Sequence, residues 1–319
     1  MSEFLVFGDW GTSRLRLFLM DGADELARID GPGIGALSAS PAETLLQALA
    51  SWRAERRLDH VFLCGMAGSR TGLVEAPYVE CPADAAAWAA RAAEIQFEDL
   101  RISVAPGLAG VAPNGAPDVM RGEEAQIFGA LALRPELAAG EHWLVLPGTH
   151  SKWCRLRDGQ VEGMHTFFTG ELFALLSQNS SLLMGARDGD APDEEAVGFG
   201  HGLARAAEGR PLGALFEARG AQLRAGRSGA WARGYLSALL IGSEIGEALQ
   251  GSKARAVVVI GAAALAKRYA TALTAAGVSS QTLSGDACAL SGLQLFAARQ
   301  ARRGRLPVQQ LGVARRGQI

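Results

Sequence analysis

Apolar and polar residues follow the same pattern in two stretches of the chain, and the rest of the prediction depends on them. The first stretch begins with the apolar run Phe4–Phe7, which ends in a polar, glycine-bearing turn at Gly8–Ser13. A second run then places leucines at every second position of Leu15–Leu19, with arginines on the other face, which is typical of a strand. Asp21-Gly22 ends this run with a strong hairpin signal. The pattern predicts a strand, a tight turn and a second strand.

A similar stretch occurs at His142–Gly159. Its apolar run Trp143–Leu146 meets a turn with glycine, hydroxyl and basic residues at Gly148–Lys152, and the following strand again ends in Asp-Gly. Two similar units, one opening each half of the chain, indicate an internal duplication. Pro147 stands where the first copy has Asp9, so the second turn lacks a backbone donor and a charge.

Elsewhere the pattern predicts helices that alternate with short strands. Ser40-Pro41-Ala42-Glu43 is a capping box with proline at the first helical position, so a helix is expected to start there. The continuous apolar run Ala256–Ile260 is typical of a buried parallel strand. Other strands are expected near residues 26–29, 60–63, 102–104 and 164–169. Helices are expected near 41–57, 84–92, 120–133, 170–177, 261–276 and 286–302, and helices with breaks near 200–226 and 228–249. Loops are expected at 106–117 and 188–195. This alternation predicts an α/β fold with mixed sheets.

The length predicts two domains, because a chain of 319 residues suggests about two. Ala138-Ala139-Gly140 is expected to connect them. We therefore expect an N-terminal domain over residues 1–139 and a C-terminal domain over residues 140–303. The basic tail at 304–319 contains glycine and proline and is expected to be flexible.

Composition and charge restrict the class of protein. A net charge of −2 supplies no basic field for nucleic acid. The four cysteines are far apart, without a C-x-x-C pair, so neither a disulfide framework nor a zinc site is indicated. The start lacks the pattern of a secretory signal, and the apolar stretch Ala254–Ala266 is too short to span a bilayer. We expect a cytoplasmic protein without nucleic-acid or membrane partners, and a homodimer stays open.

The two turns carry residue types that bind phosphate. Glycine lets the backbone approach an anion, and successive N–H groups in a turn form an anion-binding concavity to which hydroxyls add donors. The candidates are Gly11, Thr12 and Ser13 in the first turn and Gly148, Thr149, His150, Ser151 and Lys152 in the second. Two such turns facing each other would clamp a polyphosphate, and Asp9 would hold Mg²⁺ through water. The alternative is two ordinary hairpins with polar turns.

Glu123 and Glu124 follow a glycine at the expected start of a helix. The helix dipole favours carboxylates there, so capping is one interpretation. The other is that one of them, with Glu124 as first choice, accepts a proton from an attacking hydroxyl. Arg70 and Arg121 lie in loops, where arginines are commonly solvated but can also pair with the carboxylate of a sugar acid.

Other motifs are less specific. Thr169-Gly170-Glu171 has the character of a helix N-cap. Gly261 and Ala262 follow a buried strand, where small residues allow either a flat ring or close packing. His150 and His165 lack a metal-binding spacing. Neither G-x-G-x-x-G nor G-x-x-x-x-G-K-[ST] occurs, which argues against a Rossmann or P-loop site.

Together, the two turns and the late strand–helix motif resemble the superfamily of acetate and sugar kinases, Hsp70 and actin. Within it, the chain is similar to the 2-dehydro-3-deoxygalactonokinase family over most of its length. The strings that carry this resemblance are Asp9–Ser13 with Leu15-Arg16, Gly65–Ser69, Ala76–Tyr78, Val119–Glu124, Pro147–Trp153, Thr169–Leu172 and Leu240–Glu244. Their order and unusual composition make the resemblance specific.

The resemblance implies ATP-dependent phosphorylation of the C6 hydroxyl of 2-dehydro-3-deoxy-D-galactonate, a step in D-galactonate breakdown. It also implies two RNase H-like domains with ATP and Mg²⁺ in the cleft between them. Asp9 would position Mg²⁺, the two turns would hold the phosphates, and Glu124 or Glu123 would deprotonate the hydroxyl. The residues expected at the keto acid are Ser69, Arg70, Arg121, Thr169 and Glu171, and those expected at the nucleotide include Gly261 and Ala262.

Two rival functions stay open. The Arg-Gly-Glu-Glu-Ala stretch at residues 121–125 also resembles exopolyphosphatases of the same superfamily, which suggests a hydrolase of polyphosphate or of a nucleotide. The second rival is a non-catalytic, ATP-dependent regulator related to actin. The polar, glycine-rich loops at 65–70 and 106–121 fit a small acidic substrate better than either rival. The sequence does not distinguish the galactonate-derived acid from its gluconate-derived epimer.

Overall fold

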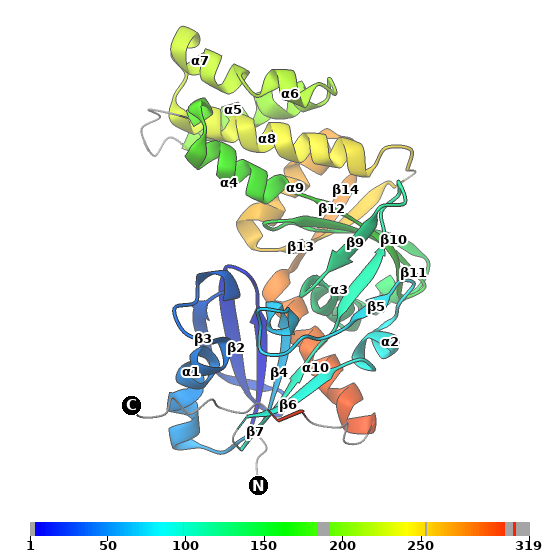
Figure 1. Ribbon diagram of the computed structural model, residues 1–319. Coiled ribbons are helices and arrows are strands. Elements are labelled where there is room, and N and C mark those ends of the chain that lie inside the picture. The colour runs from blue at the N-terminus through cyan, green and yellow to red at the C-terminus, as the bar shows by residue number, and fades with distance from the viewer. Residues whose placement is uncertain (1–3, 98, 184–191, 253, 304–308, 311–319) are drawn as a thin grey trace. The chain divides into compact units, whose positions relative to one another are not determined.

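The chain forms two compact units, each with sheets and helices (Figure 1). The computed structural model describes residues 4–97, 99–183, 192–252, 254–303 and 309–310. The first unit comprises the described residues of Met1–Gly140, Arg157–Gly163 and Gly285–Ile319, and the second those of Glu141–Leu156 and Met164–Ser284. The predicted α/β class is therefore confirmed.

A seven-stranded mixed sheet with the order β15-β6-β7-β4-β1-β2-β3 is the centre of the first unit. Its strands are β1 (Phe4–Trp10), β2 (Arg14–Asp21), β3 (Asp24–Pro32), β4 (Leu58–Gly65), β6 (Ala93–Phe97), β7 (Leu100–Val104) and β15 (Gln309–Gln310). The predicted hairpin is formed by β1 and β2, which pair antiparallel, and β4 pairs with β1 in parallel. β1 lies inside this sheet and α10 packs against it, and its residues are buried from Val6 to Trp10.

Helices and a smaller sheet complete the first unit. The helices are α1 (Pro41–Glu55), α2 (Ala85–Ala89), α3 (Glu123–Leu133) and α10 (Gly285–Arg303), with short 3-10 turns η1 (Ile34–Ala36), η2 (Met66–Gly68) and η3 (Pro135–Ala138). The three-stranded sheet consists of β5 (Tyr78–Glu80), β8 (Gly107–Val111) and β9 (Pro117–Met120). The predicted capping box starts α1: the Ser40 hydroxyl accepts from the Glu43 N–H at 3.2 Å, and the Glu43 carboxylate accepts from the Ser40 N–H at 3.1 Å.

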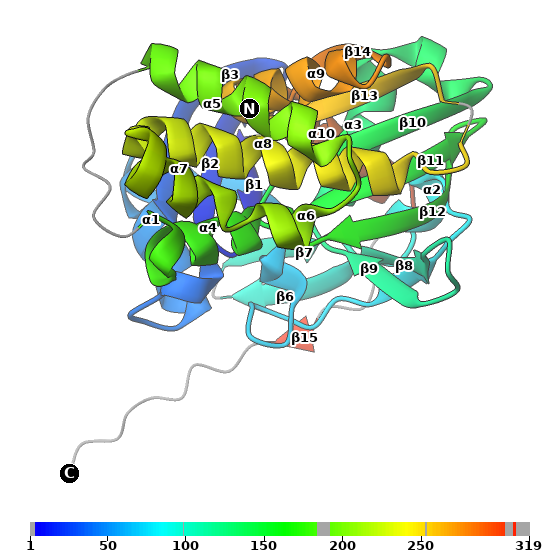
Figure 2. The same ribbon diagram turned by 90° about the horizontal axis from the view of Figure 1, so that it is seen from above.

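The second unit contains a five-stranded sheet with the order β12-β11-β10-β13-β14. The strands are β10 (Glu141–Leu146), β11 (Ser151–Arg157), β12 (Gln160–Phe167), β13 (Ala256–Gly261) and β14 (Ser279–Ser284). The helices are α4 (Thr169–Asn179), α5 (Pro192–Ala206), α6 (Pro211–Ala214), α7 (Glu217–Ala225), α8 (Gly229–Ala248) and α9 (Ala263–Ala275), and η4 spans Ser181–Leu183. The long helix α8 packs along α5, and both views show the two side by side (Figure 2).

Several predicted elements were wrong in extent. The loop expected at 188–195 is helical from Pro192, because proline at a first helical position and acidic residues in a first turn both favour a helix start. Residues 188–191 lie outside the described residues. The loop expected at 106–117 contains β8, whereas the helices with breaks expected at 200–226 are found as the end of α5, α6 and α7.

The two units also differ from the expected domain boundaries. Helix α10 belongs to the first unit, where it packs on α3, although it was expected within a domain at 140–303. Residues 157–163 likewise belong to the first unit, and Ala83 there forms a bridge with Val161. Of the tail at 304–319, only Gln309–Gln310 is described, as β15 paired with β6, and the rest of that prediction lies outside the described residues.

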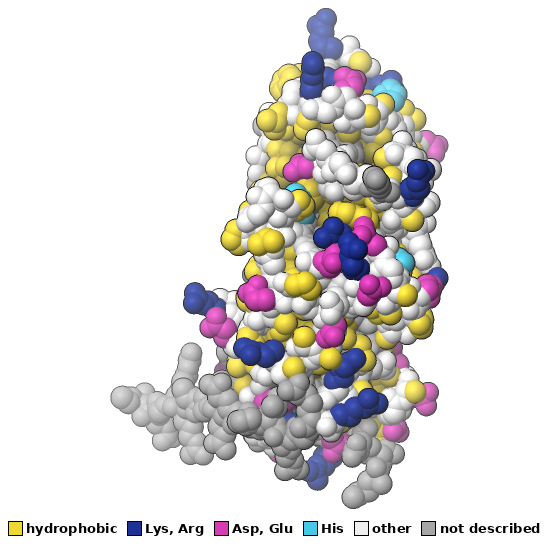
Figure 3. Space-filling model, turned by 90° about the vertical axis from the view of Figure 1, so that its right-hand side faces the viewer, with side chains coloured by type: hydrophobic (Ala, Val, Ile, Leu, Met, Phe, Trp, Pro, Cys, Tyr) yellow, Lys and Arg dark blue, Asp and Glu magenta, His cyan; other side chains and the backbone are white. Residues whose placement is uncertain are grey.

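Charges of both signs are interspersed on the face of the molecule that Figure 3 shows. This agrees with a net charge of −2 over the whole sequence. In the part of the chain that the structure describes, none of the helices combines the length and the apolar character needed to cross a membrane.

Two glycines allow α3 and α10 to pack with their backbones in contact. A Cβ atom on Gly129 of α3 would lie 1.8 Å from the carbonyl oxygen of Cys288 on α10. Reciprocally, a Cβ atom on Gly292 of α10 would lie 1.9 Å from the carbonyl oxygen of Ala125 on α3. A side chain at either position would have to push the helices apart.

We therefore expect Gly129→Ala to lower the free energy of unfolding by about 1–3 kcal/mol or more, because overpacking forces the backbones to move. Urea unfolding of the purified variant measures this. The matched control is Gly246→Ala on α8, where a Cβ atom would meet nothing within 4 Å. There alanine is favoured by roughly 1 kcal/mol. A stabilised Gly129→Ala variant would contradict the close packing.

Candidate active site

Asp9 lies at the end of β1, in the first unit. The strand register pairs it with Arg16 on β2 and with Cys64 on β4, so the three side chains share one face of the sheet. Asp9 is only 5% exposed. Arg16 donates to its Oδ2 atom, and the Cys64 sulfur lies 3.8 Å from its Oδ1 atom. Burial raises the pKa of Asp9, and the Arg16 guanidinium opposes that shift.

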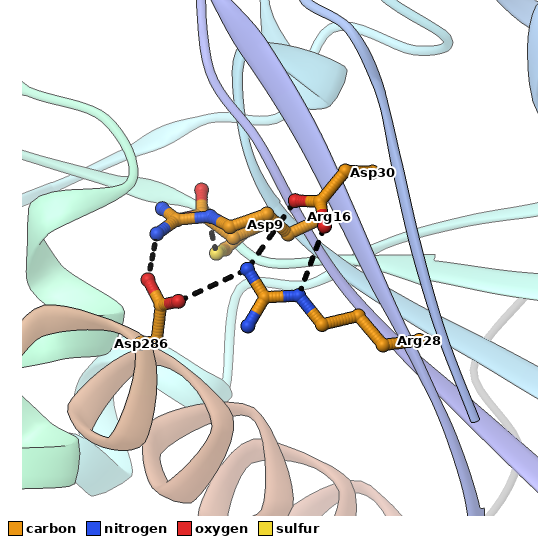
Figure 4. Close-up of polar contacts among 6 residues, drawn as sticks. Asp9, Arg16, Arg28, Asp30 and Asp286 are labelled. Atoms are coloured by element: carbon orange, nitrogen blue, oxygen red, sulfur yellow. Dashed lines mark hydrogen bonds and ion pairs between the residues drawn. The ribbon is translucent and has the colours of Figure 1, made fainter.

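Arg16 is shared with a second carboxylate, Asp286, in the first turn of α10. Arg28 of β3 also pairs with Asp286 at 3.0 Å and with Asp30 at 3.2 Å. Figure 4 shows both guanidinium groups directed at the Asp286 carboxylate. Sequence reasoning missed Asp286, because 270 positions separate it from Arg16 and its only local signal is an acid at a helix start.

Glu124 is completely buried in the first turn of α3. The Gly122 N–H donates to its two oxygens, at 2.9 and 2.7 Å. Burial raises the pKa of Glu124 well above its usual range, and the neighbouring Glu123 adds to the shift. Glu123 accepts from the Arg121 N–H at 3.1 Å. Both carboxylates therefore bond backbone groups at the helix start, as the capping alternative expects, but only Glu124 is desolvated.

The buried carboxylates Asp9 and Glu124 lie near each other. Gly65 and Gly122 have φ angles of 80° and 113°, which side chains rarely adopt. A Cβ atom on Gly122 would lie 3.2 Å from the Gly65 Cα and 4.0 Å from the Asp9 Oδ1 atom. The pKa of the Cys64 thiol is raised well above its usual value, first by burial and then by the charges of Asp9 and Glu124. Asp9 and Glu124 thus form one acidic group around a buried thiol.

Arg121 places a cation next to this group. Its Nη2 atom donates to the Ala76 carbonyl at 2.8 Å, and its guanidinium carbon lies 4.2 Å from the centroid of the Tyr78 ring. A Cβ atom on Gly68 would lie 2.7 Å from the Nη1 atom. This Nη1 atom is buried and has no hydrogen-bond partner among the described residues. Arg121 is therefore held against the loop at 65–70, and its Nη1 atom stays available to bind a ligand.

Ser69 and Arg70, also predicted for the keto acid, lie differently. The Ser69 hydroxyl donates to the Met66 carbonyl at 2.8 Å. The Arg70 side chain is 86% exposed and pairs with Glu75 at 3.3 Å. Neither bond involves Arg121, so the structure does not join these residues into one group.

Backbone hydrogen bonds hold the first turn, Gly11–Ser13, in a fixed conformation. The Gly11 N–H donates to the Arg14 carbonyl at 2.8 Å, and the Gly11 and Thr12 carbonyls accept from N–H groups of η1, each at 3.0 Å. Thr12 and Ser13 are exposed. The turn therefore presents two hydroxyl residues at the surface on a fixed backbone.

The second turn, Gly148–Lys152, lies in the second unit and packs against the start of α4. The Glu171 N–H donates to the Thr149 carbonyl at 2.8 Å, and its carboxylate lies 2.7 Å from the His150 Nε2 atom. A Cβ atom on Gly170 would lie 2.1 Å from the carbonyl oxygen of Gly148. The Thr169-Gly170-Glu171 motif is therefore a structural support of this turn.

Ser151 and Lys152 of the second turn are buried. The Lys152 ammonium donates to the Thr166 hydroxyl at 2.8 Å, and the Ser151 hydroxyl lies 2.7 Å from the Tyr269 hydroxyl. Tyr269 in turn donates to Glu244 at 2.8 Å. Sequence reasoning gave Glu244 no role, although an acid in the apolar helix α8 was a usable signal, because a buried carboxylate requires partners.

A cavity of about 280 Å³ adjoins this turn within the second unit. It is lined by Gly148, Thr169, Gly170, Phe173, Arg233, Ser237, Leu240, Ile241, Ala264, Leu265, Arg268 and Tyr269. The start of α9 supplies part of the lining, directly after Gly261 and Ala262. A Cβ atom on Gly261 would lie 3.6 Å from the Pro147 ring. The late small-residue motif thus meets the second turn beside a largely apolar cavity.

Comparison with known proteins shows the family to which this chain is related. The sequence profile of the family described as 2-keto-3-deoxy-galactonokinase matches residues 9–296. The protein named "Probable 2-dehydro-3-deoxygalactonokinase DgoK1" from Rhizobium meliloti (strain 1021) is 39% identical over 295 residues, which cover 91% of this chain and 95% of the relative. The 2-dehydro-3-deoxygalactonokinase of Escherichia coli (strain K12) is 32% identical over 294 residues, which cover 91% and 96%.

Solved structures give the same result. The crystal structure of a Sinorhizobium meliloti protein that bears the same family name superposes with a TM-score of 0.84 at 37% identity, covering 92% of this chain and 95% of that one. Component A of the Acidaminococcus fermentans (R)-2-hydroxyglutaryl-CoA dehydratase has a TM-score of 0.52 at 13% identity over 93% and 99% of the two chains, which is a likeness of fold alone. Profile, relatives and fold agree, and the chain belongs to the 2-keto-3-deoxy-galactonokinase family.

Proposed function

We propose that this protein transfers the γ-phosphoryl group of ATP to the C6 hydroxyl of 2-dehydro-3-deoxy-D-galactonate, a step in D-galactonate catabolism. Family membership supports the kinase class and the sugar-acid substrate. In the structure, the observation that carries the proposal is the desolvated Glu124 carboxylate beside Asp9. Such a step uses ATP and a metabolic acid, so we expect it in the cytoplasm.

Glu124 is the proposed acceptor of the hydroxyl proton. A general base works best when its pKa lies near the working pH, and burial moves the pKa of Glu124 in that direction. Each Glu124 oxygen accepts from the same Gly122 N–H, and a carboxylate offers about four lone-pair sites, so acceptor sites remain for a substrate hydroxyl. Glu123 stays the second choice for this role.

Arg121 is the proposed ligand of the substrate carboxylate. Its unpartnered Nη1 atom is a buried donor, and arginine binds carboxylates with two parallel hydrogen bonds where geometry permits. Ser69 and Arg70 stay proposed contacts of the keto acid, since their loop adjoins Arg121 through Gly68. Thr169 and Glu171 have contacts that favour a supporting role at the second turn.

The nucleotide is proposed to bind the second unit. Its adenosine would enter the cavity of about 280 Å³ beside Gly261 and Ala262, and its phosphates would lie on the turn Gly148–Lys152. The exposed residues Thr149 and His150 supply backbone and side-chain donors there. The first turn, Gly11–Ser13, is proposed as a further phosphate contact. These groups position the phosphates and neutralise their charge, which is most of the catalysis in phosphoryl transfer.

Mg²⁺ is proposed to join ATP at Asp9. Among the described residues, no group of three or more histidine, cysteine, aspartate or glutamate side chains could hold a metal ion. A single carboxylate nevertheless fits Mg²⁺, which keeps several waters and takes other ligands from phosphates. Asp9 Oδ1 is the suitable atom, because Oδ2 is bonded to Arg16. When bound, Mg²⁺ neutralises charge on the β- and γ-phosphates.

An ADP-release assay with Mg-ATP tests the function. We expect turnover with 2-dehydro-3-deoxy-D-galactonate and only background release with hexoses or without an acceptor. Comparison with the gluconate-derived epimer then determines the stereochemical preference. ADP release that ignores the acceptor would overturn the sugar-acid kinase and favour a phosphohydrolase, and nucleotide-dependent assembly without turnover would favour an actin-like regulator.

Replacement of the proposed base tests its role. We expect Glu124→Gln to lower kcat by roughly 10²-fold or more, because the amide cannot accept the proton. The comparison variant is Glu123→Gln, whose side chain is less buried and for which we expect a smaller loss. Steady-state kinetics of both variants decide between the two carboxylates. Near-normal turnover of Glu124→Gln would remove Glu124 from the role.

The burial of Glu124 also predicts how stability depends on pH. Its pKa in the folded protein lies above the ordinary value of 4.5, so the folded state favours the neutral form. The stability contributed by that form is fully present below about pH 4.5 and is lost as the pH rises through the raised pKa. Glu124→Gln should therefore be more stable than the wild type at about pH 8, and the difference should vanish near pH 4. Urea unfolding across this range measures it, and a difference that grows toward low pH would contradict the cause.

A further inference from the structure

Glu244 is a buried acid on the apolar helix α8. It is 3% exposed and has Ile241 and Ile245, both buried, on the same helix. An ionised carboxylate in such a place is unfavourable unless donors surround it. Its partners therefore indicate what the carboxylate does.

Three side-chain donors meet at this carboxylate. The Trp153 indole donates to Oε1 and the Tyr269 hydroxyl to Oε2, each at 2.8 Å. The Thr169 side chain also forms a hydrogen bond with it. A carboxylate has about four lone-pair sites, so these three donors fill most of its acceptor capacity and oppose the rise in pKa that burial causes. The donors come from β11, α4 and α9, and Glu244 thus ties three elements to α8.

The network determines which way the Ser151 hydroxyl points. Tyr269 has one hydroxyl hydrogen, and it goes to Glu244. At the contact of 2.7 Å between the two hydroxyls, Ser151 is therefore the donor. Its hydrogen points into the protein, in agreement with its complete burial. Ser151 anchors the end of the second turn and has no hydrogen left to give to a phosphate.

The other end of the turn is anchored through α4. Thr169, the first residue of α4, bonds Glu244. The next two residues support the turn directly, because Gly170 packs on the Gly148 carbonyl and the Glu171 N–H donates to the Thr149 carbonyl at 2.8 Å. Glu244 thus fixes the turn at both of its ends without lying in it.

We propose that Glu244 is a positioning residue for the phosphates of the bound nucleotide. It holds the backbone N–H groups of Gly148–Lys152 in the geometry that receives the β- and γ-phosphates. A fixed turn needs no reorganisation when the anion arrives, which is what makes such donors effective. This inference rests on the proposed function for the assignment of the turn to ATP, and it adds a residue that touches no ligand.

The test compares nucleotide affinity in Glu244→Gln and wild type. The amide places an NH₂ group against hydrogen-bond donors, so at least one of the three bonds to this side chain is lost and the turn loosens. We expect the Kd for MgADP, measured by titration calorimetry without sugar acid, and the KM for MgATP to rise on the order of ten-fold, as misplaced binding groups cause. The KM for the sugar acid should change by less than about two-fold, since its proposed ligands belong to the first unit.

Two further variants distinguish a loss of turn geometry from a general loss of stability. Tyr269→Phe removes only the hydroxyl that links Glu244 to Ser151, and we expect a several-fold rise in the same Kd. The control is Tyr235→Phe, which removes a bond of 2.7 Å between Tyr235 of α8 and Glu217, away from the turn. We expect that variant to lose stability in thermal melts and to keep the wild-type Kd.

Wild-type affinity for MgADP in folded Glu244→Gln and Tyr269→Phe would overturn the inference, as would an equal rise in Tyr235→Phe. If Glu244→Gln does not fold, Tyr269→Phe decides the question. A wild type that binds MgADP but does not phosphorylate the sugar acid would overturn the proposed function instead, and the affinity comparison would still stand. A wild type that binds no MgADP would overturn the inference.

Discussion

The ion pair between Asp9 and Arg16 is the interaction on which the site of the first unit depends. Its position follows from the β1–β2 register, which makes the two residues direct neighbours on one face of the sheet. A carboxylate as buried as Asp9 is unfavourable as an anion without a cation at hand, and removal of one partner of a buried pair typically costs about 3–5 kcal/mol. Asp286 holds the other side of the same guanidinium, so α10 is joined to the strand that carries Asp9. Arg16, which the buried Asp9 needs as a partner, thus connects β1 to α10 and holds the proposed metal ligand in place.

The second unit also has a buried carboxylate behind its turn, but that carboxylate has different hydrogen-bond partners. Its turn follows β10 as the first turn follows β1, but Pro147 stands at the place of Asp9 and offers no charge. The anion behind this turn is instead Glu244, which comes from α8 and is satisfied by indole and hydroxyl donors rather than by an arginine. Two similar sequence patterns thus support turns of similar outline with different chemistry. That difference agrees with separate tasks, in which one turn adjoins the proposed base and metal ligand and the other adjoins a cavity for the nucleotide.

Local patterns were sufficient to predict the parts of the fold that depend on neighbours in the sequence. The first hairpin, the capping box at Ser40 and the buried strand β13 all appear as expected, because alternation, caps and apolar runs act over a few residues. Glu123 and Glu124 could be named as candidates because acids after a glycine at a helix start are a visible signal, but the burial that distinguishes Glu124 could not be predicted. The place of α10 in the first unit and the partnership of Asp286 with Arg16 could not be predicted, because they depend on contacts between distant segments. The small sheet of β5, β8 and β9 was missed because its strands are short, β8 contains glycine and β9 begins with proline.

The most direct test of the account is a crystal structure of the wild-type protein with MgADP and 2-dehydro-3-deoxy-D-galactonate. The account predicts the C6 hydroxyl of the sugar acid within hydrogen-bond distance of the Glu124 carboxylate, and the diphosphate on the backbone of Gly148–Lys152. A sugar acid whose C6 hydroxyl lies away from both Glu124 and Glu123, or a diphosphate bound elsewhere than on that turn, would contradict it.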